Sequence, residues 1–157
     1  MSTSTSHRAL AGITAVLAFA AILLVVSLVS SNGKERPVAW RDLSGQVGRL
    51  FIGHYERRLF RNRSKLADFL RKAGARHAAP PVDFSSRQLL LLSPGPRSST
   101  GYGVDVLSVR EGDGKITVRV RERTPRLGER VAAHITYPYR LLSLPAGENV
   151  YVDWLGR

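Results

Sequence analysis

The feature that most constrains this chain is an uninterrupted apolar run near its N-terminus. Residues 9–31 contain no charged side chain, and about 20 apolar helical residues span the hydrocarbon core of a bilayer. The run has no polar face, which argues against a helix buried in a globular core. A signal peptide would have a shorter apolar region and a better cleavage site than residues 29–31 provide. We therefore predict a short tail at residues 1–8 and an uncleaved transmembrane helix at 9–31, with Ala9–Val29 in contact with membrane lipid.

The charges that flank this run bear on its orientation. Lys34, Arg36, Arg41 and Arg49 follow the run within about 20 residues, whereas only Arg8 and the amino terminus precede it. Under the positive-inside rule, this bias places the C-terminal part in the cytoplasm. Long domains translocate largely regardless of flanking charge, so the rule is weak evidence here.

The rest of the chain is strongly basic and lacks cysteine. Its 24 basic residues outnumber its 12 acidic residues, and all but four of the basic residues are Arg. The absence of Cys excludes a disulfide scaffold, a thiolate zinc site and a cysteine nucleophile. Twelve basic and four acidic residues fall within residues 31–79, so an anion- or lipid-facing surface is expected there. Its candidate residues are Arg57, Arg58, Arg61, Arg63, Lys65, Arg71 and Lys72.

Two other interpretations of this charge stay open. Basic residues interleaved with aromatic ones, here Phe60 and Phe69, also occur in nucleic-acid-binding surfaces. We disfavour nucleic acid as a partner because both Phe residues fall at expected core positions, and because a membrane-anchored protein seldom needs to bind it. A solvated basic face, or a coding bias towards Arg, accounts for the same composition.

The composition after the apolar run indicates a polar linker at residues 32–45 and a single β-rich domain at residues 46–157. One helix is predicted in this domain, because a cap residue, an apolar stripe and a terminating glycine occur in the required order. These residues are Asn62 or Ser64 as the cap, Leu66, Phe69 and Leu70 as the stripe, and Gly74 as the end.

The remaining pattern is that of β structure, and the predicted fold class is α+β with a small, mostly antiparallel β domain and one helix. A Gly-Asp-Gly turn at residues 112–114 predicts a hairpin. Its simplest register sets Asp105 opposite Arg121 on one face and Val106 opposite Val120 on the other. Short strands are predicted at residues 47–52, 55–60, 89–92, 104–110, 115–123, 131–135, 141–144 and 149–152.

Motifs of catalysis are missing from the sequence. There is no G-x-S-x-G elbow, no H-E-x-x-H pair and no phosphate-binding loop, and the histidines are better explained as surface or core residues. We therefore predict that the chain is not an enzyme and that it uses no metal and no cofactor.

Several short motifs occur in a recognisable order between residues 82 and 145. They are Asp83-Phe84, an apolar strand, a loop ending in Thr100-Gly101-Tyr102, paired strands, and Pro138-Tyr139 followed by a second apolar strand. This order resembles the C-terminal domain of the PrcB family, although that family has a second Gly where this chain has Thr100, and Pro where it has Ser99. The resemblance implies a non-catalytic subunit of a surface protease complex, a protein partner such as a protease, and a domain exposed outside the cytoplasm.

The Thr-Gly-Tyr loop is also similar to one loop of chagasin-type protease inhibitors. That family has an Arg-Pro-Trp loop as well, and Trp154 lacks the preceding Arg-Pro. A chagasin-like inhibitor is therefore an alternative function.

The loop sequence itself predicts a contact surface formed by two turns at one end of the sheet. Both turns are stiffened by Gly or Pro and carry a Tyr, which buries much area at a low cost in side-chain entropy. The alternative is that Tyr102 packs under the sheet and that the glycines only turn the corner. The predicted contact residues are Thr100, Gly101, Tyr102, Gly103, Pro138 and Tyr139.

Overall fold

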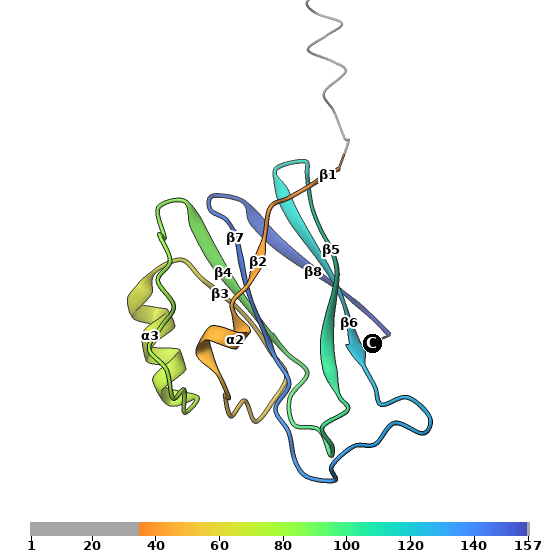
Figure 1. The fold of residues 1–157 in the computed structure, drawn as a ribbon. Helices are drawn as coiled ribbons and strands as arrows, with labels where there is room; N and C mark the ends of the chain where they lie inside the picture. The colour runs from red at the N-terminus through yellow and green to blue at the C-terminus, as the bar shows by residue number, and fades with distance from the viewer. Residues whose placement is uncertain (1–34, 157) are drawn as a thin grey trace, which may run out of the picture. The chain divides into compact units, whose positions relative to one another are not determined.

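A computed structural model describes residues 35–156, which form two four-stranded sheets and a helical layer (Figure 1). The first sheet has the order β1 (Arg36–Pro37), β5 (Gly103–Gly112), β6 (Lys115–Arg123) and β8 (Asn149–Leu155). The second has the order β2 (Arg41–Asp42), β7 (Arg140–Pro145), β4 (Arg87–Ser93) and β3 (Glu56–Phe60). The helices are α2 (Ser44–Val47) and α3 (Arg63–Lys72).

The predicted tail and transmembrane helix, residues 1–8 and 9–31, lie outside the described residues. Within residues 35–156, no helix is long and apolar enough to cross a bilayer.

The strand β4 lies between the two apolar cores of the domain. Leu89 and Leu91 pack with α2, α3 and β3, whereas Leu90 and Leu92 pack against β5 and β6 of the first sheet. All four side chains are at most 2% exposed. A strand covered on both faces has no solvent face to make polar, which explains the continuous Leu run and confirms the predicted buried strand.

The predicted helix is confirmed as α3. The side chain of Asn62 accepts a hydrogen bond from the backbone N–H of Lys65 at 2.9 Å and caps the N-terminus. Leu66 and Leu70 are buried against the second sheet. Gly74 has a φ of +73°, the left-handed conformation that ends many helices.

The predicted hairpin is confirmed as β5 and β6, with Asp105 opposite Arg121 and Val106 opposite Val120. The turn itself has only two residues outside the ladder, Asp113 and Gly114, both with positive φ. It is one residue shorter than predicted, and a β-bulge between Val106 and Ser108 takes up the difference.

Two predicted strands are wrong. Residues 47–52 contain the end of α2 and an irregular segment, in which Val47, Leu50 and Ile52 all point into one core. A strand would have sent alternate side chains to opposite faces. Residues 131–135 form a loop in which every residue is exposed, so their apolar alternation does not correspond to a buried face.

Two further differences concern the edges of the sheets. The segment predicted as a linker, residues 32–45, contributes β1 and β2 to the sheets, and Leu43 is 8% exposed. Strands of two residues are too short to show a period in the sequence. The sheets are mostly antiparallel as predicted, but β8 pairs with β6 in parallel.

We expect Val120→Ala to lower the free energy of unfolding by about 1–3 kcal/mol, because Val120 is fully buried between the sheets. Arg121→Ala should cost at most a few tenths of a kcal/mol, because its 3.7 Å ion pair with Asp105 is largely exposed. Thermal and denaturant unfolding of both variants measures these changes in the free energy of unfolding. A larger loss for Arg121→Ala would invert our assignment of the two faces.

Candidate functional site

Two long loops meet at one end of the sheets (Figure 1). Residues 94–102 connect β4 to β5, and residues 124–139 connect β6 to β7. Figure 1 shows both at the end opposite the β5–β6 turn. We call these two loops the loop surface, and they contain the turns that the sequence predicted to lie at one end.

Backbone and side-chain hydrogen bonds hold the two loops together. The backbones of Arg97 and Thr136 exchange two hydrogen bonds of 2.9 and 2.8 Å. The Thr136 hydroxyl donates to the Ser99 carbonyl at 2.8 Å. Thr100 donates its N–H to the Ala132 carbonyl, and the Ala132 N–H donates to the Thr100 hydroxyl at 3.0 Å. The loops are therefore positioned by each other.

Gly101 packs closely against the loop that connects β6 to β7. A Cβ atom built on it would lie 2.6 Å from Pro125 Cγ and 2.7 Å from Val131 Cγ1. Neither Gly101 nor Gly103 has a positive φ, so these two positions do not depend on the backbone freedom of glycine. Gly101 is needed because there is no room for a side chain.

An ion pair fixes the base of the loop surface to β6. The Arg97 guanidinium donates both Nε and Nη2 to the carboxylate of Glu122, and it also donates to the Pro96 carbonyl at 2.8 Å. The hydrogen bond with Glu122 raises the pKa of Arg97 above its already high value, so the cation stays charged. Such paired bonds set orientation as well as distance.

Apolar side chains project from the loop surface into solvent. Leu127 is fully exposed and Ile135 is 64% exposed, and Val131, which lies next to Gly101, is 36% exposed. Phe51 extends the patch, since it is 54% exposed and its ring meets Tyr137 edge to face at 5.4 Å. Clusters of exposed apolar groups are typical of protein-contact surfaces.

The sequence reasoning missed Leu127 and Ile135. It assigned residues 131–135 to a strand, and a strand would have buried half of them. Pro125 and Gly128 are residues typical of a turn, and they could have indicated a loop at Leu127 and next to residues 131–135.

The two predicted tyrosines have different environments. Tyr102 is partly exposed on the loop surface. Tyr139 is partly buried, and its hydroxyl donates to the carbonyl oxygens of Ser44 and Gly48, across α2. Burial, followed by the nearby carboxylate of Asp42, raises the pKa of Tyr139 to about 12. Tyr139 thus stabilises α2 and is not an exposed anchor.

The predicted basic cluster lies on β3, on α3 and on the turn between them. Several of its members already have partners: Arg58 pairs with Glu56 at 3.1 Å and stacks over the Phe69 ring, and Arg71 pairs with Asp68 at 2.8 Å. The others are Arg61 and Arg63, which donate to neighbouring oxygens, and Arg57, Lys65 and Lys72, which make no ion pair within residues 35–156.

The described residues hold no group of three or more His, Asp or Glu side chains that could bind a metal ion. The loop surface offers exposed apolar side chains on loops that hydrogen bonds hold in place.

Comparison with known proteins supports the resemblance from residue 89 onward and leaves Asp83-Phe84 outside the matched range. A family model described as PrcB C-terminal matches residues 89–145. The matched range runs from within β4 to the end of β7 and includes the whole of both loops. The predicted PrcB-like C-terminal domain is therefore confirmed. No match is found among curated proteins or among solved structures.

We expect Gly101→Ala to separate the two loops, because its Cβ overlaps Pro125 and Val131. Overpacking of this kind costs about 1–3 kcal/mol. Amide hydrogen exchange should accelerate at residues 97–100 and 132–136. Gly53→Ala is the matched control, since no atom lies within 4 Å of its Cβ position and its φ is not positive. Equal effects of the two substitutions would contradict this role for Gly101.

Proposed function

We propose that this chain is a non-catalytic accessory subunit whose PrcB-like domain contacts a partner protein, a protease, through the loop surface. The observation that carries the proposal is the position of the fixed, apolar loop surface inside the segment that matches the PrcB C-terminal model. The resemblance drawn from the sequence implies a subunit of a surface protease complex, and such a role needs a contact surface without catalytic groups.

The physical state of the loops suits binding. Their mutual hydrogen bonds and the Arg97–Glu122 ion pair order them before any partner arrives. Association then costs less conformational entropy than it would with flexible loops. Leu127 and Ile135 supply apolar area that a partner can bury, and the partly exposed Tyr102 supplies an amphipathic contact.

Anchoring to a membrane through residues 9–31 is part of the proposal. The described chain begins beside β1, which pairs with Arg110 and Glu111 next to the β5–β6 turn. The loop surface adjoins the other end of β5, and ten residues of strand extend about 33 Å. Glu35, where the described chain begins, therefore lies at the end of β5 remote from the loop surface. We place the domain outside the cytoplasm, against the flanking charge bias.

This topology gives a direct test. Protease added to intact cells should digest the chain beyond Pro37, and carbonate washing should leave the full-length chain in the membrane fraction. Digestion only after lysis would place the domain in the cytoplasm, as the flanking charges favour. Recovery of a soluble chain beginning near Asn32 would show a cleaved signal peptide.

Two alternatives receive less support. A chagasin-like inhibitor would use a Trp on a third loop, whereas Trp154 lies within β8 and its ring meets Tyr55 edge to face at 5.5 Å. A module that binds anionic lipid or nucleic acid would use the basic cluster, but Arg58 and Arg71 already pair with carboxylates. We therefore propose contact with lipid only for the predicted membrane helix, and we disfavour nucleic acid as a partner.

Partner capture tests the loop surface. Tagged full-length chain is purified from detergent-solubilised membranes, and the co-purifying protease is quantified. Leu127→Ser should reduce its recovery about tenfold or more without changing the melting temperature, because Leu127 is fully exposed. Tyr102→Ala should reduce it to a similar extent.

The matched control for this experiment is Tyr151→Ala, on β8, where Tyr151 is 55% exposed and lies outside the loop surface. It should leave recovery unchanged. If Leu127→Ser and Tyr102→Ala fold normally and retain full recovery of the protease, the loop surface is not the contact site. If a Tyr102 variant loses recovery only in proportion to its loss of folded protein, Tyr102 has a packing role instead.

A further inference from the structure

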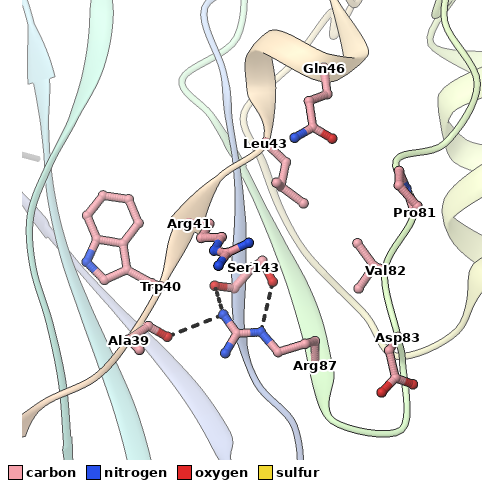
Figure 2. A pocket seen from close by; sticks show the side chains of 10 residues that line it. All are labelled: Ala39, Trp40, Arg41, Leu43, Gln46, Pro81, Val82, Asp83, Arg87 and Ser143. Carbon is pink, nitrogen blue, oxygen red and sulfur yellow. Dashed lines mark hydrogen bonds between the residues drawn. The ribbon is translucent and has the colours of Figure 1, made fainter.

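A second concave site lies on the helical side of the second sheet, outside the loop surface. It has a volume of about 520 Å³, within the range of pockets that hold small ligands or short peptides. Figure 2 shows it between the segment that leads into β2, the start of α2 and the segment that precedes β4. We call it the Trp40 pocket, and its lining residues are Ala39, Trp40, Arg41, Leu43, Gln46, Pro81, Val82, Asp83, Arg87 and Ser143.

Arg87 lines this pocket, and only part of its guanidinium group is hydrogen-bonded to the protein. The Arg87 Nε donates to the Ser143 hydroxyl at 3.0 Å, and Nη2 donates to the carbonyls of Ser143 at 2.8 Å and Ala39 at 3.3 Å (Figure 2). Its Nη1 makes no hydrogen bond or ion pair with any residue that the structure describes. Three bonds therefore fix the guanidinium while two N–H donors stay available.

The charges around Arg87 favour a singly charged anion. Arg41 lines the same pocket, is exposed, and forms no ion pair within residues 35–156. Asp83 also lines it, but its carboxylate accepts hydrogen bonds from the hydroxyls of Ser85 and Ser86, which lower the pKa of Asp83. A negative Asp83 beside two cations leaves one net positive charge, which matches a carboxylate better than a phosphate dianion.

The walls of the pocket are apolar. Figure 2 shows the Trp40 ring on one side of the Arg87 guanidinium and Val82 on the other. Trp40 is 37% exposed although it is large and aromatic, and the buried Leu43 also lines the pocket. A ligand that fits this lining carries an apolar group next to its carboxylate.

We infer that the Trp40 pocket binds a peptide carboxylate, with the anion on Arg87 Nη1 and Arg41 and an adjacent apolar side chain between Trp40 and Val82. Charge-assisted hydrogen bonds from guanidinium N–H groups bind carboxylates strongly in proteins. The carboxylate is either the C-terminus of a peptide or an acidic side chain, since both offer the same two oxygens. The inference does not depend on the loop surface, because the two sites share no residue.

The test uses full-length chain in a neutral detergent and three synthetic peptides whose N-termini are blocked. The first ends in Leu-Leu with a free C-terminal carboxylate, and the second is the same peptide with a C-terminal amide. The third also has a C-terminal amide and carries one Asp next to a Leu. Binding is measured by calorimetry and by Trp fluorescence. We expect the free carboxylate to bind at least tenfold more tightly than the amide. Equally tight binding by the Asp peptide would identify an acidic side chain as the source of the carboxylate.

Substitutions inside and outside the pocket test whether the peptide binds in the Trp40 pocket. Arg41→Ala should weaken binding several-fold, and Trp40→Ala should do the same through the apolar wall. The matched control is Arg49→Ala, which removes an exposed Arg outside the pocket and should leave the affinity unchanged. Equal losses for Arg41→Ala and Arg49→Ala would reduce the effect to net charge and overturn the inference.

Two further outcomes would also overturn it. Equal binding of the acid and amide peptides would show that no carboxylate is recognised. Displacement of the peptide by inorganic phosphate or by anionic phospholipid vesicles, at concentrations where acetate has no effect, would assign the pocket to phosphate or lipid instead.

Discussion

The burial of β4 on both faces is the interaction on which the rest of the domain depends. Its four consecutive Leu residues, 89–92, belong alternately to the helix-side core and to the core between the sheets. Burying a Leu side chain contributes about 1.5–3 kcal/mol, and β4 also forms the ladders to β3 and β7. The strand therefore contributes to the packing of the helical layer and of both sheets. Without β4, both apolar cores would lose part of their packing.

The same strand positions both sites. At its end, the Ser93 hydroxyl donates to the Pro138 carbonyl at 2.9 Å and accepts from the Gly95 N–H at 3.1 Å, which starts the loop surface. At its beginning, Arg87 is fixed against Ser143 of β7 and points into the Trp40 pocket. The two sites thus stand at opposite ends of one buried strand.

Local patterns predicted the elements that are stabilised locally. The α3 helix has its Asn62 cap and Gly74 end in sequence, and the hairpin has its Gly-Asp-Gly turn. The α2 helix was not predictable, because it is held by the hydroxyl of Tyr139, 91 residues from Gly48. The β1 and β2 strands were missed because two residues carry no period. The loop surface was predicted in part. The sequence predicted that the turns containing Thr100 and Pro138 lie at one end of the sheet. The exposure of Leu127 could not be predicted, because it depends on how the whole domain packs.

Hydrogen exchange of the chain alone and in complex with its co-purified protease tests the central claim, that the loop surface is the contact with the partner. Residues 126–135 are exposed and residues 97–102 are partly exposed, so a partner seated on these loops should slow the exchange of their amides clearly. Exchange along α3 should stay unchanged. Slowed exchange confined to β3 and α3, with both loops exchanging as fast as in the free chain, would contradict the account and assign the contact to the basic face.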